Sequence, residues 1–91
     1  MDAVKVSNMT SSKGNKVANQ FIIESELGTY FQSYDTVIAF KSKSSGKVYL
    51  DADAWDYSVT TGKYRNLFLG ETKQETMKKI KSGEYILVNL N

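Results

Sequence analysis

Two short segments of the chain combine hydroxyl groups, a glycine and a lysine, which are residue types that bind phosphate. They are residues 60–63 (TTGK) and residues 44–47 (SSGK). In a P-loop, a glycine lies five residues before the Gly-Lys pair, and a serine or threonine follows the lysine. Around the first segment these positions hold Tyr57 and Tyr64, and around the second they hold Lys41 and Val48. Neither segment therefore matches a nucleotide-binding loop.

Residues 44–47 also fit the S-x-x-K pattern of some acyl-transfer enzymes. A nucleophilic serine needs a rigid element and an activated lysine, whereas this pattern lies in the polar segment 41–47, which we expect to be a hairpin tip. The chain has no histidine and no cysteine, so the usual catalytic bases and thiolates are absent from the sequence. We expect no enzymatic activity and no catalytic residues.

Three aspartates, Asp51, Asp53 and Asp56, lie close together and suggest calcium. An EF-hand loop that begins at Asp51 would need glycine at its sixth position and glutamate at its twelfth. Those positions hold Asp56 and Gly62. We expect three solvated carboxylates, no metal and no cofactor.

Residues 49–69 contain the single tryptophan, further aromatic residues and a Lys-Tyr-Arg triplet, a mixture that is typical of recognition surfaces. We expect Tyr57, Lys63 and Arg65 to be exposed, and Trp55 to be mostly buried because a small domain needs its largest side chain in the core. The predicted binding residues are Tyr57, Thr60, Thr61, Lys63, Tyr64 and Arg65. The alternative is that Trp55, Tyr64, Leu67 and Phe68 are simply core.

A second group of side chains could contact phosphate: Lys41, Lys43 and Lys47. Together with Lys63 and Arg65, and with a tyrosine that stacks on bases, they would form a nucleic-acid-binding patch. The net charge of +2 is too small to indicate this function by itself.

The length of 91 residues predicts one domain, 1–91, in which the polar segment 1–16 is partly irregular. A composition with 41% apolar and 24% charged residues is that of a globular protein. The chain has neither an apolar run that could cross a membrane nor a signal peptide, so we expect a cytoplasmic protein without membrane contact.

Alternating and continuous apolar patterns predict five strands, at 17–24, 29–34, 37–40, 48–50 and 85–90. Residues 4–9 are a candidate for a further short strand, followed by a loop. The segment 37–40 is apolar on both faces and is expected to be central. The fold class is α+β, a mainly antiparallel sheet of about five strands with two short helices on one face, in the order β-β-β-β-α-α-β.

The two helices have recognisable ends. Ser58 is expected to cap the first and Gly70 to end it, with Tyr64, Leu67 and Phe68 facing the core. The segment 72–75 (TKQE) is a capping box for the second helix, and Gly83 is its expected end. The predicted buried stripe of the second helix is Thr76, Met77 and Ile80.

Four segments carry a resemblance to a known family: VSNMTSSKGNKVANQFII (6–23), TYFQSYDTVIAF (29–40), WDYSVTTGKYRNLFLGET (55–72) and KKIKSGEYILVNLN (78–91). They resemble a family of small proteins that are encoded by bacteriophages, plasmids and gut-bacterial mobile elements and that form a domain of unknown function. The resemblance covers nearly the whole chain and implies a phage or mobile-element accessory protein. It implies no chemistry and no functional residues.

Three functions follow as hypotheses. The first is stoichiometric binding to a host or phage protein through the predicted binding residues. The second is nucleic-acid binding, and the third is sequestration of a small ligand, which would need a well-formed apolar pocket. A homodimer that pairs through an exposed edge strand is a further hypothesis.

Overall fold

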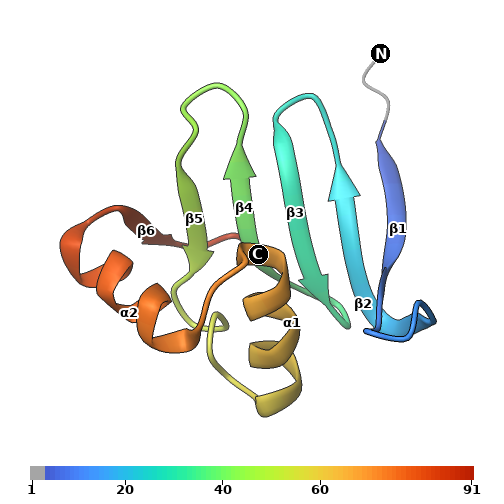
Figure 1. Cartoon of the computed structure of the whole chain (residues 1–91). Helices are drawn as coiled ribbons and strands as arrows, with labels where there is room; N and C mark the ends of the chain where they lie inside the picture. The colour runs from blue at the N-terminus through green and yellow to red at the C-terminus, as the bar shows by residue number, and fades with distance from the viewer. Residues whose placement is uncertain (1–3) are drawn as a thin grey trace.

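The computed structural model describes residues 4–91 and contains one six-stranded sheet and two helices (Figure 1). The predicted α+β class is confirmed. Residues 1–3 of the predicted polar N-terminal segment lie outside the described residues. The elements are β1 (Lys5–Thr10), β2 (Lys16–Glu24), β3 (Gly28–Ser33), β4 (Thr36–Ser42), β5 (Val48–Asp51), α1 (Val59–Leu69), α2 (Lys73–Ser82) and β6 (Tyr85–Val88).

The six strands lie side by side in the order in which they occur in the chain. The first five form an antiparallel meander, and β6 then pairs with β5 in parallel, with Val48 opposite Tyr85. A parallel pair needs a long crossover connection, which α1 and α2 provide here. The expected number of about five strands is therefore one too few, and the sheet is mixed. The polar strand β1 completes it through backbone pairing with β2.

The core lies between the sheet and the helices. Phe31, Ala39 and Leu50 are paired across β3, β4 and β5 and are fully buried. A bulge between β3 and β4 also allows Ile38 to be buried beside Ala39, as expected for a central strand. The ring of Phe68 from α1 lies 5.7 Å from that of Phe31, so α1 is held on this side of the sheet.

The helix ends are those that the sequence predicts. The Ser58 side chain accepts a hydrogen bond from the Thr61 amide at 3.1 Å, and Gly70 ends α1 in the left-handed region. Both hydrogen bonds of the Thr72–Glu75 capping box are present, and Gly83 ends α2.

The predicted inward faces of the helices are partly wrong. Leu67 is 56% exposed, and Met77 is also exposed. In α1 the inward positions hold Thr61, Tyr64, Arg65 and Phe68, which have the 3–4 residue spacing of one helix face. Arg65 therefore belongs to the inward face and Leu67 does not. The sequence did not indicate this, because a buried arginine is an exception to the usual pattern.

Candidate functional site

The predicted binding residues are divided between the two sides of α1. Thr61, Tyr64 and Arg65 are buried, and Arg65 is only 1% exposed, so its expected exposure is wrong. Tyr57, in the turn before the helix, is half exposed, and Thr60 and Lys63 are exposed. The exposed and buried members cannot form one continuous contact surface.

Arg65 connects α1 to the turn that precedes the helix. Its Nη1 atom donates hydrogen bonds to the backbone carbonyl of Trp55 at 2.7 Å and to the Asp56 carboxylate at 3.2 Å. Its Nη2 atom donates to the side-chain oxygen of Asn66 at 3.0 Å. The guanidinium carbon also lies 5.1 Å from the Trp55 ring, within the range of a cation–π contact. These contacts provide hydrogen-bond partners for most of the buried guanidinium group, so Arg65 has a structural role.

Thr61 attaches α1 to the sheet. Its hydroxyl group lies 3.0 Å from that of Ser33 in β3, and both residues are buried. A Cβ atom at Gly62 would lie at ordinary contact distance from the Arg65 guanidinium, 3.6 Å away, so the close packing there does not itself require a glycine. Together Thr61 and Arg65 fix which side of α1 faces outward.

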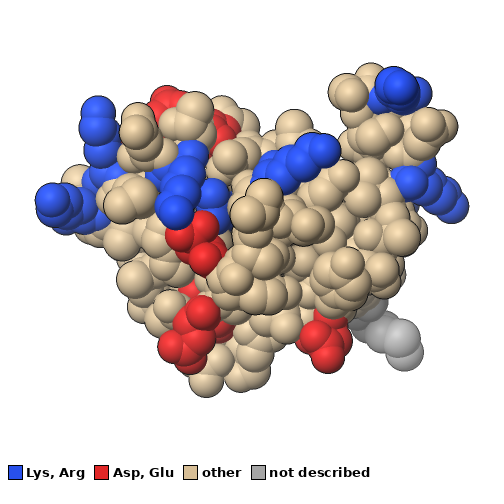
Figure 2. Space-filling model, turned by 90° about the horizontal axis from the view of Figure 1, so that it is seen from below, with Lys and Arg blue, Asp and Glu red and all other residues tan. Residues whose placement is uncertain are grey.

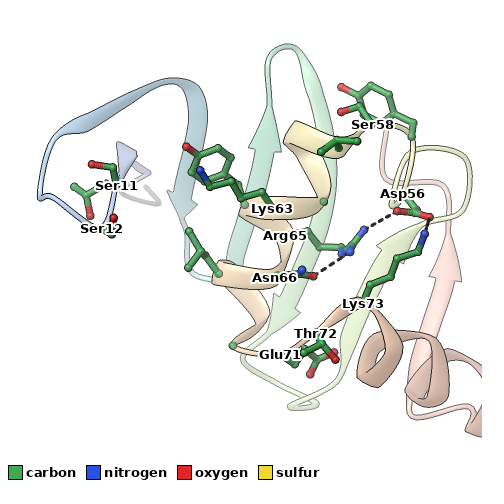
Figure 3. A pocket seen from close by; sticks show the side chains of 17 residues that line it. Ser11, Ser12, Asp56, Ser58, Lys63, Arg65, Asn66, Glu71, Thr72 and Lys73 are labelled. Carbon is green, nitrogen blue, oxygen red and sulfur yellow. Dashed lines mark hydrogen bonds and ion pairs between the residues drawn. The ribbon is translucent and has the colours of Figure 1, made fainter.

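The outward side of α1 lines a broad, open groove (Figure 3). On one side of the helix lies the turn between β1 and β2, which contributes Ser11 and Ser12. On the other side lie Asp56, Ser58 and the beginning of α2 at Lys73. The groove is therefore built from three parts of the chain that are distant in sequence.

Apolar side chains project along the outer ridge of α1. Val59, Lys63 and Leu67 follow one another at intervals of four residues, which places them on one side of the helix. Val59 is 92% exposed, and Tyr57 lies just before it on the same groove wall. Among the predicted binding residues, Tyr57 and Lys63 belong to this ridge. Val59 and Leu67 were missed, although their four-residue spacing could have indicated them.

An ion-pair cluster lines one side of the groove. Asp56 lies between the guanidinium of Arg65 and the Lys73 ammonium, which is 2.6 Å away (Figure 3). Partial burial alone would raise the pKa of the Asp56 carboxyl. The hydrogen bonds and positive charges of Lys73 and Arg65 outweigh this effect and hold the pKa below its usual value. The charged ends of these groups are thus already paired.

A second charged cluster, which the sequence did not indicate, surrounds Glu71. The Glu71 side chain is 4% exposed and accepts hydrogen bonds from Lys79 Nζ at 2.7 Å, the Tyr85 hydroxyl at 2.7 Å and the Thr76 hydroxyl at 2.6 Å. Burial would raise its pKa, but these three donors lower it. Burial and the Glu71 charge raise the pKa of Tyr85 to about 12, and the bond to Glu71 raises that of Lys79. The cluster joins α2 to β6.

The three clustered aspartates do not share one environment. Asp51 is buried, so its expected solvation is wrong, and its two oxygens accept hydrogen bonds from the amides of Ala54 and Leu90, each at 2.9 Å. Burial would raise its pKa, but these and further hydrogen bonds lower it. Among residues 4–91, no group of three histidine, cysteine or acidic side chains could hold a metal ion.

The three lysines of the β4–β5 hairpin do not line the groove. Lys41 Nζ donates to the carbonyl of Phe68 at 2.6 Å and lies over its ring, 4.3 Å from the centroid. Partial burial lowers the pKa of Lys41. Lys43 and Lys47 are exposed around the hairpin turn, whereas Lys63 lies near the middle of α1, on its ridge.

One family model matches residues 4–84, which is most of the chain: the Family of unknown function (DUF8033). The chain belongs to this family. No curated protein and no solved structure shows significant similarity to it.

The DUF8033 match includes every residue that lines the groove, from Thr10 to Lys73. It also includes Glu71 and Lys79, whereas Tyr85 lies just beyond it. Within the described part of this DUF8033 protein, neither helix has the length and apolar character that a membrane span requires.

Proposed function

We propose that this DUF8033 protein is a non-enzymatic binding protein that acts by stoichiometric contact with another protein. The contact surface is the α1 ridge, defined as Tyr57, Val59, Lys63 and Leu67, together with the groove beside it. The observation that carries the proposal is the exposure of two aliphatic side chains, Val59 and Leu67, on the outer side of a helix whose inner side is fixed by buried residues.

The chemistry of the ridge favours a protein segment as the partner. Tyr57 can contribute a large, rigid contact area, and aromatic residues are enriched at the centres of interfaces. Lys63 lies between the two aliphatic residues, and its ammonium is 5.4 Å from the Tyr64 ring. An apolar helix or strand that carries a nearby carboxylate would complement this arrangement. The paired charges of Asp56 and Lys73 would form the polar rim.

Two other functions have less support. Nucleic-acid binding needs a continuous basic surface, whereas the lysine and arginine side chains on the face in Figure 2 stand in separate groups with uncharged surface between them. Sequestration of a small ligand needs a pocket that encloses most of the ligand, and the groove is open to solvent.

The biological setting is part of the proposal. The resemblance to phage and mobile-element proteins suggests an accessory protein that works in the cytoplasm of a bacterial host. Fold and family alone do not identify a function, so the partner has to be found by experiment.

A pull-down tests the α1 ridge directly. The tagged protein is incubated with bacterial lysate, with and without nuclease, and retained proteins and nucleic acids are identified. Captured candidates are then purified and titrated against the wild type and two groove variants, Tyr57→Ala and Leu67→Ala. Met77→Ala is the matched control, because Met77 is an equally exposed apolar residue on α2 outside the groove.

The expected result of the pull-down is a stoichiometric protein partner that is retained after nuclease treatment. In the titrations, the groove variants should lose about 2 kcal/mol of binding free energy, and the control should lose none. If the groove variants bind as tightly as the wild type, the α1 ridge is not the contact surface. If only nucleic acid is retained and it is lost after nuclease treatment, the protein-binding function is wrong.

A further inference from the structure

One row of paired residues crosses all six strands. In strand order it runs through Val6, Ile23, Tyr30, Phe40, Tyr49 and Ile86, each opposite the next in the register. Directly paired residues point to the same face of a sheet. The row therefore forms a continuous stripe of aliphatic and aromatic side chains, which we call the cross-sheet row.

The cross-sheet row lies on the face of the sheet away from the helices. Phe31, Ala39 and Leu50, which pack under the helices, are the sequence neighbours of Tyr30, Phe40 and Tyr49. Successive residues in a strand point to opposite faces. No member of the row belongs to the core cluster or packs against it, and no helix of residues 4–91 covers this face (Figure 1).

The aromatic members of the row lie close to one another. The rings of Tyr30 and Phe40 are stacked, with centroids 4.4 Å apart, and those of Phe40 and Tyr49 are 6.1 Å apart. All three side chains remain partly exposed, and Val6 at the edge of the sheet is exposed. The rings already order one another, so a partner would meet a preformed surface and lose little rotamer entropy.

Most side chains around the row are uncharged. Positions two residues away on the same face include Asn8, Phe21, Gln32, Ser42 and Val88. The charged residues at such positions are Asp51, which is buried and hydrogen-bonded, and Lys47 and Glu84, which are exposed just before β5 and β6. An antiparallel sheet with one solvated face normally places polar residues there, so a mostly uncharged aromatic face indicates an interface.

We propose that the protein forms a symmetric dimer in which the cross-sheet rows of two copies pack face to face. The molecule is a slab of 34 × 34 × 20 Å, and the sheet extends across its broad side. A standard interface buries about 800 Å² per partner, which a face of this size can supply. Because the middle of the face is uncharged and the exposed Lys47 and Glu84 lie just before β5 and β6, a second copy can pack against the row without burying an unpaired charge. Two such sheets would pack about 10 Å apart as a sandwich.

The cross-sheet row is separate from the α1 ridge, which lies on the helix side of the sheet and stays exposed in the dimer. Sedimentation equilibrium over a range of micromolar concentrations should give twice the chain mass of 10.2 kDa. Tyr30→Lys places a charge at the middle of the face and should weaken dimerisation at least about tenfold. Val59→Lys makes the same kind of change on the other side of the molecule and should leave the dimer unchanged.

A second variant tests the same surface if Tyr30→Lys does not fold. Val6→Lys changes an exposed member of the row at the sheet edge, so the fold should tolerate it, and it should also weaken the dimer. Circular dichroism confirms that each variant is folded. The proposal is overturned if the wild type is monomeric at every concentration, or if the folded row variants dimerise as tightly as Val59→Lys.

Discussion

The Nη1 atom of Arg65 lies 2.7 Å from the backbone carbonyl oxygen of Trp55, and this buried contact joins α1 to the preceding turn. The same guanidinium also reaches Asp56 and Asn66. A residue type that is usually solvent-exposed is therefore part of the interior framework of the candidate site. It orients α1 so that Val59, Lys63 and Leu67 point outward.

Replacement of Arg65 should destabilise the fold. Arg65→Met keeps much of the side-chain volume but leaves the Trp55 carbonyl without its donor, and we expect a loss of about 3 kcal/mol in the free energy of unfolding. Urea denaturation measures the loss. Lys63→Met is the control on the exposed side of the helix and should change stability by no more than about 0.5 kcal/mol. Equal effects of the two substitutions would contradict the structural role of Arg65.

Glu71 should make stability sensitive to acid. Its folded-state pKa lies below the ordinary value of 4.5, so the folded protein keeps the carboxylate ionised while the unfolded chain takes up a proton. The contribution of Glu71 to the free energy of unfolding is therefore complete above pH 4.5. It is lost as the pH falls through the lower pKa of the folded state. Glu71→Gln should cost about 2 kcal/mol near neutral pH and should reduce the loss on acidification.

The control for this experiment is Glu84→Gln. Glu84 is exposed, and its carboxylate is 4.0 Å from Lys79. The variant should keep both the neutral-pH stability and the acid sensitivity of the wild type, as followed by urea denaturation at several pH values. If Glu71→Gln retains the full acid sensitivity, the lowered pKa does not belong to Glu71.

Tyr85 should give the opposite response in alkali. Its pKa is raised from 10.0 to about 12, so the folded state holds its proton longer than the unfolded chain. The contribution of Tyr85 to the free energy of unfolding is therefore complete below pH 10.0, and it is lost as the pH rises through about 12. Phenolate absorbance of the folded protein should show a late-titrating component from Tyr85. Tyr85→Phe should remove the late-titrating component, whereas Tyr57→Phe should keep it. If the component remains in Tyr85→Phe, it belongs to another tyrosine.

Local signals in the sequence predict the elements of this fold well. Ser58, Gly70 and the capping box at Thr72 act through neighbouring backbone groups, so their spacing is sufficient to place both helices. The strands likewise follow from local apolar patterns. The parallel pairing of β5 with β6 depends on where the two helices return the chain, which no local pattern specifies.

The candidate site was less predictable because contacts between distant parts of the chain decide which of its residues are buried and which are exposed. Arg65 is buried only because the Trp55 carbonyl and Asp56 are brought to it, and Leu67 is exposed in consequence. The Glu71 cluster similarly depends on Tyr85, fourteen positions away in the chain. The cross-sheet row could not be recognised without the register, since its members come from six separate strands.

Gly28 should be essential at the start of β3 because its backbone has a φ of 152° and packs against β4. A Cβ atom there would overlap the backbone carbonyl of Lys41, which cannot move without disturbing the ladder. Gly28→Ala should therefore lower the free energy of unfolding by about 3 kcal/mol. Gly14→Ala is the matched control, since Gly14 also has a positive φ but has open space around it, and it should cost only about 1 kcal/mol. Thermal unfolding measures the loss of stability in each variant, and the difference between the two losses reports the steric overlap. Similar losses of stability in both variants would show that the overlap at residue 28 is relieved.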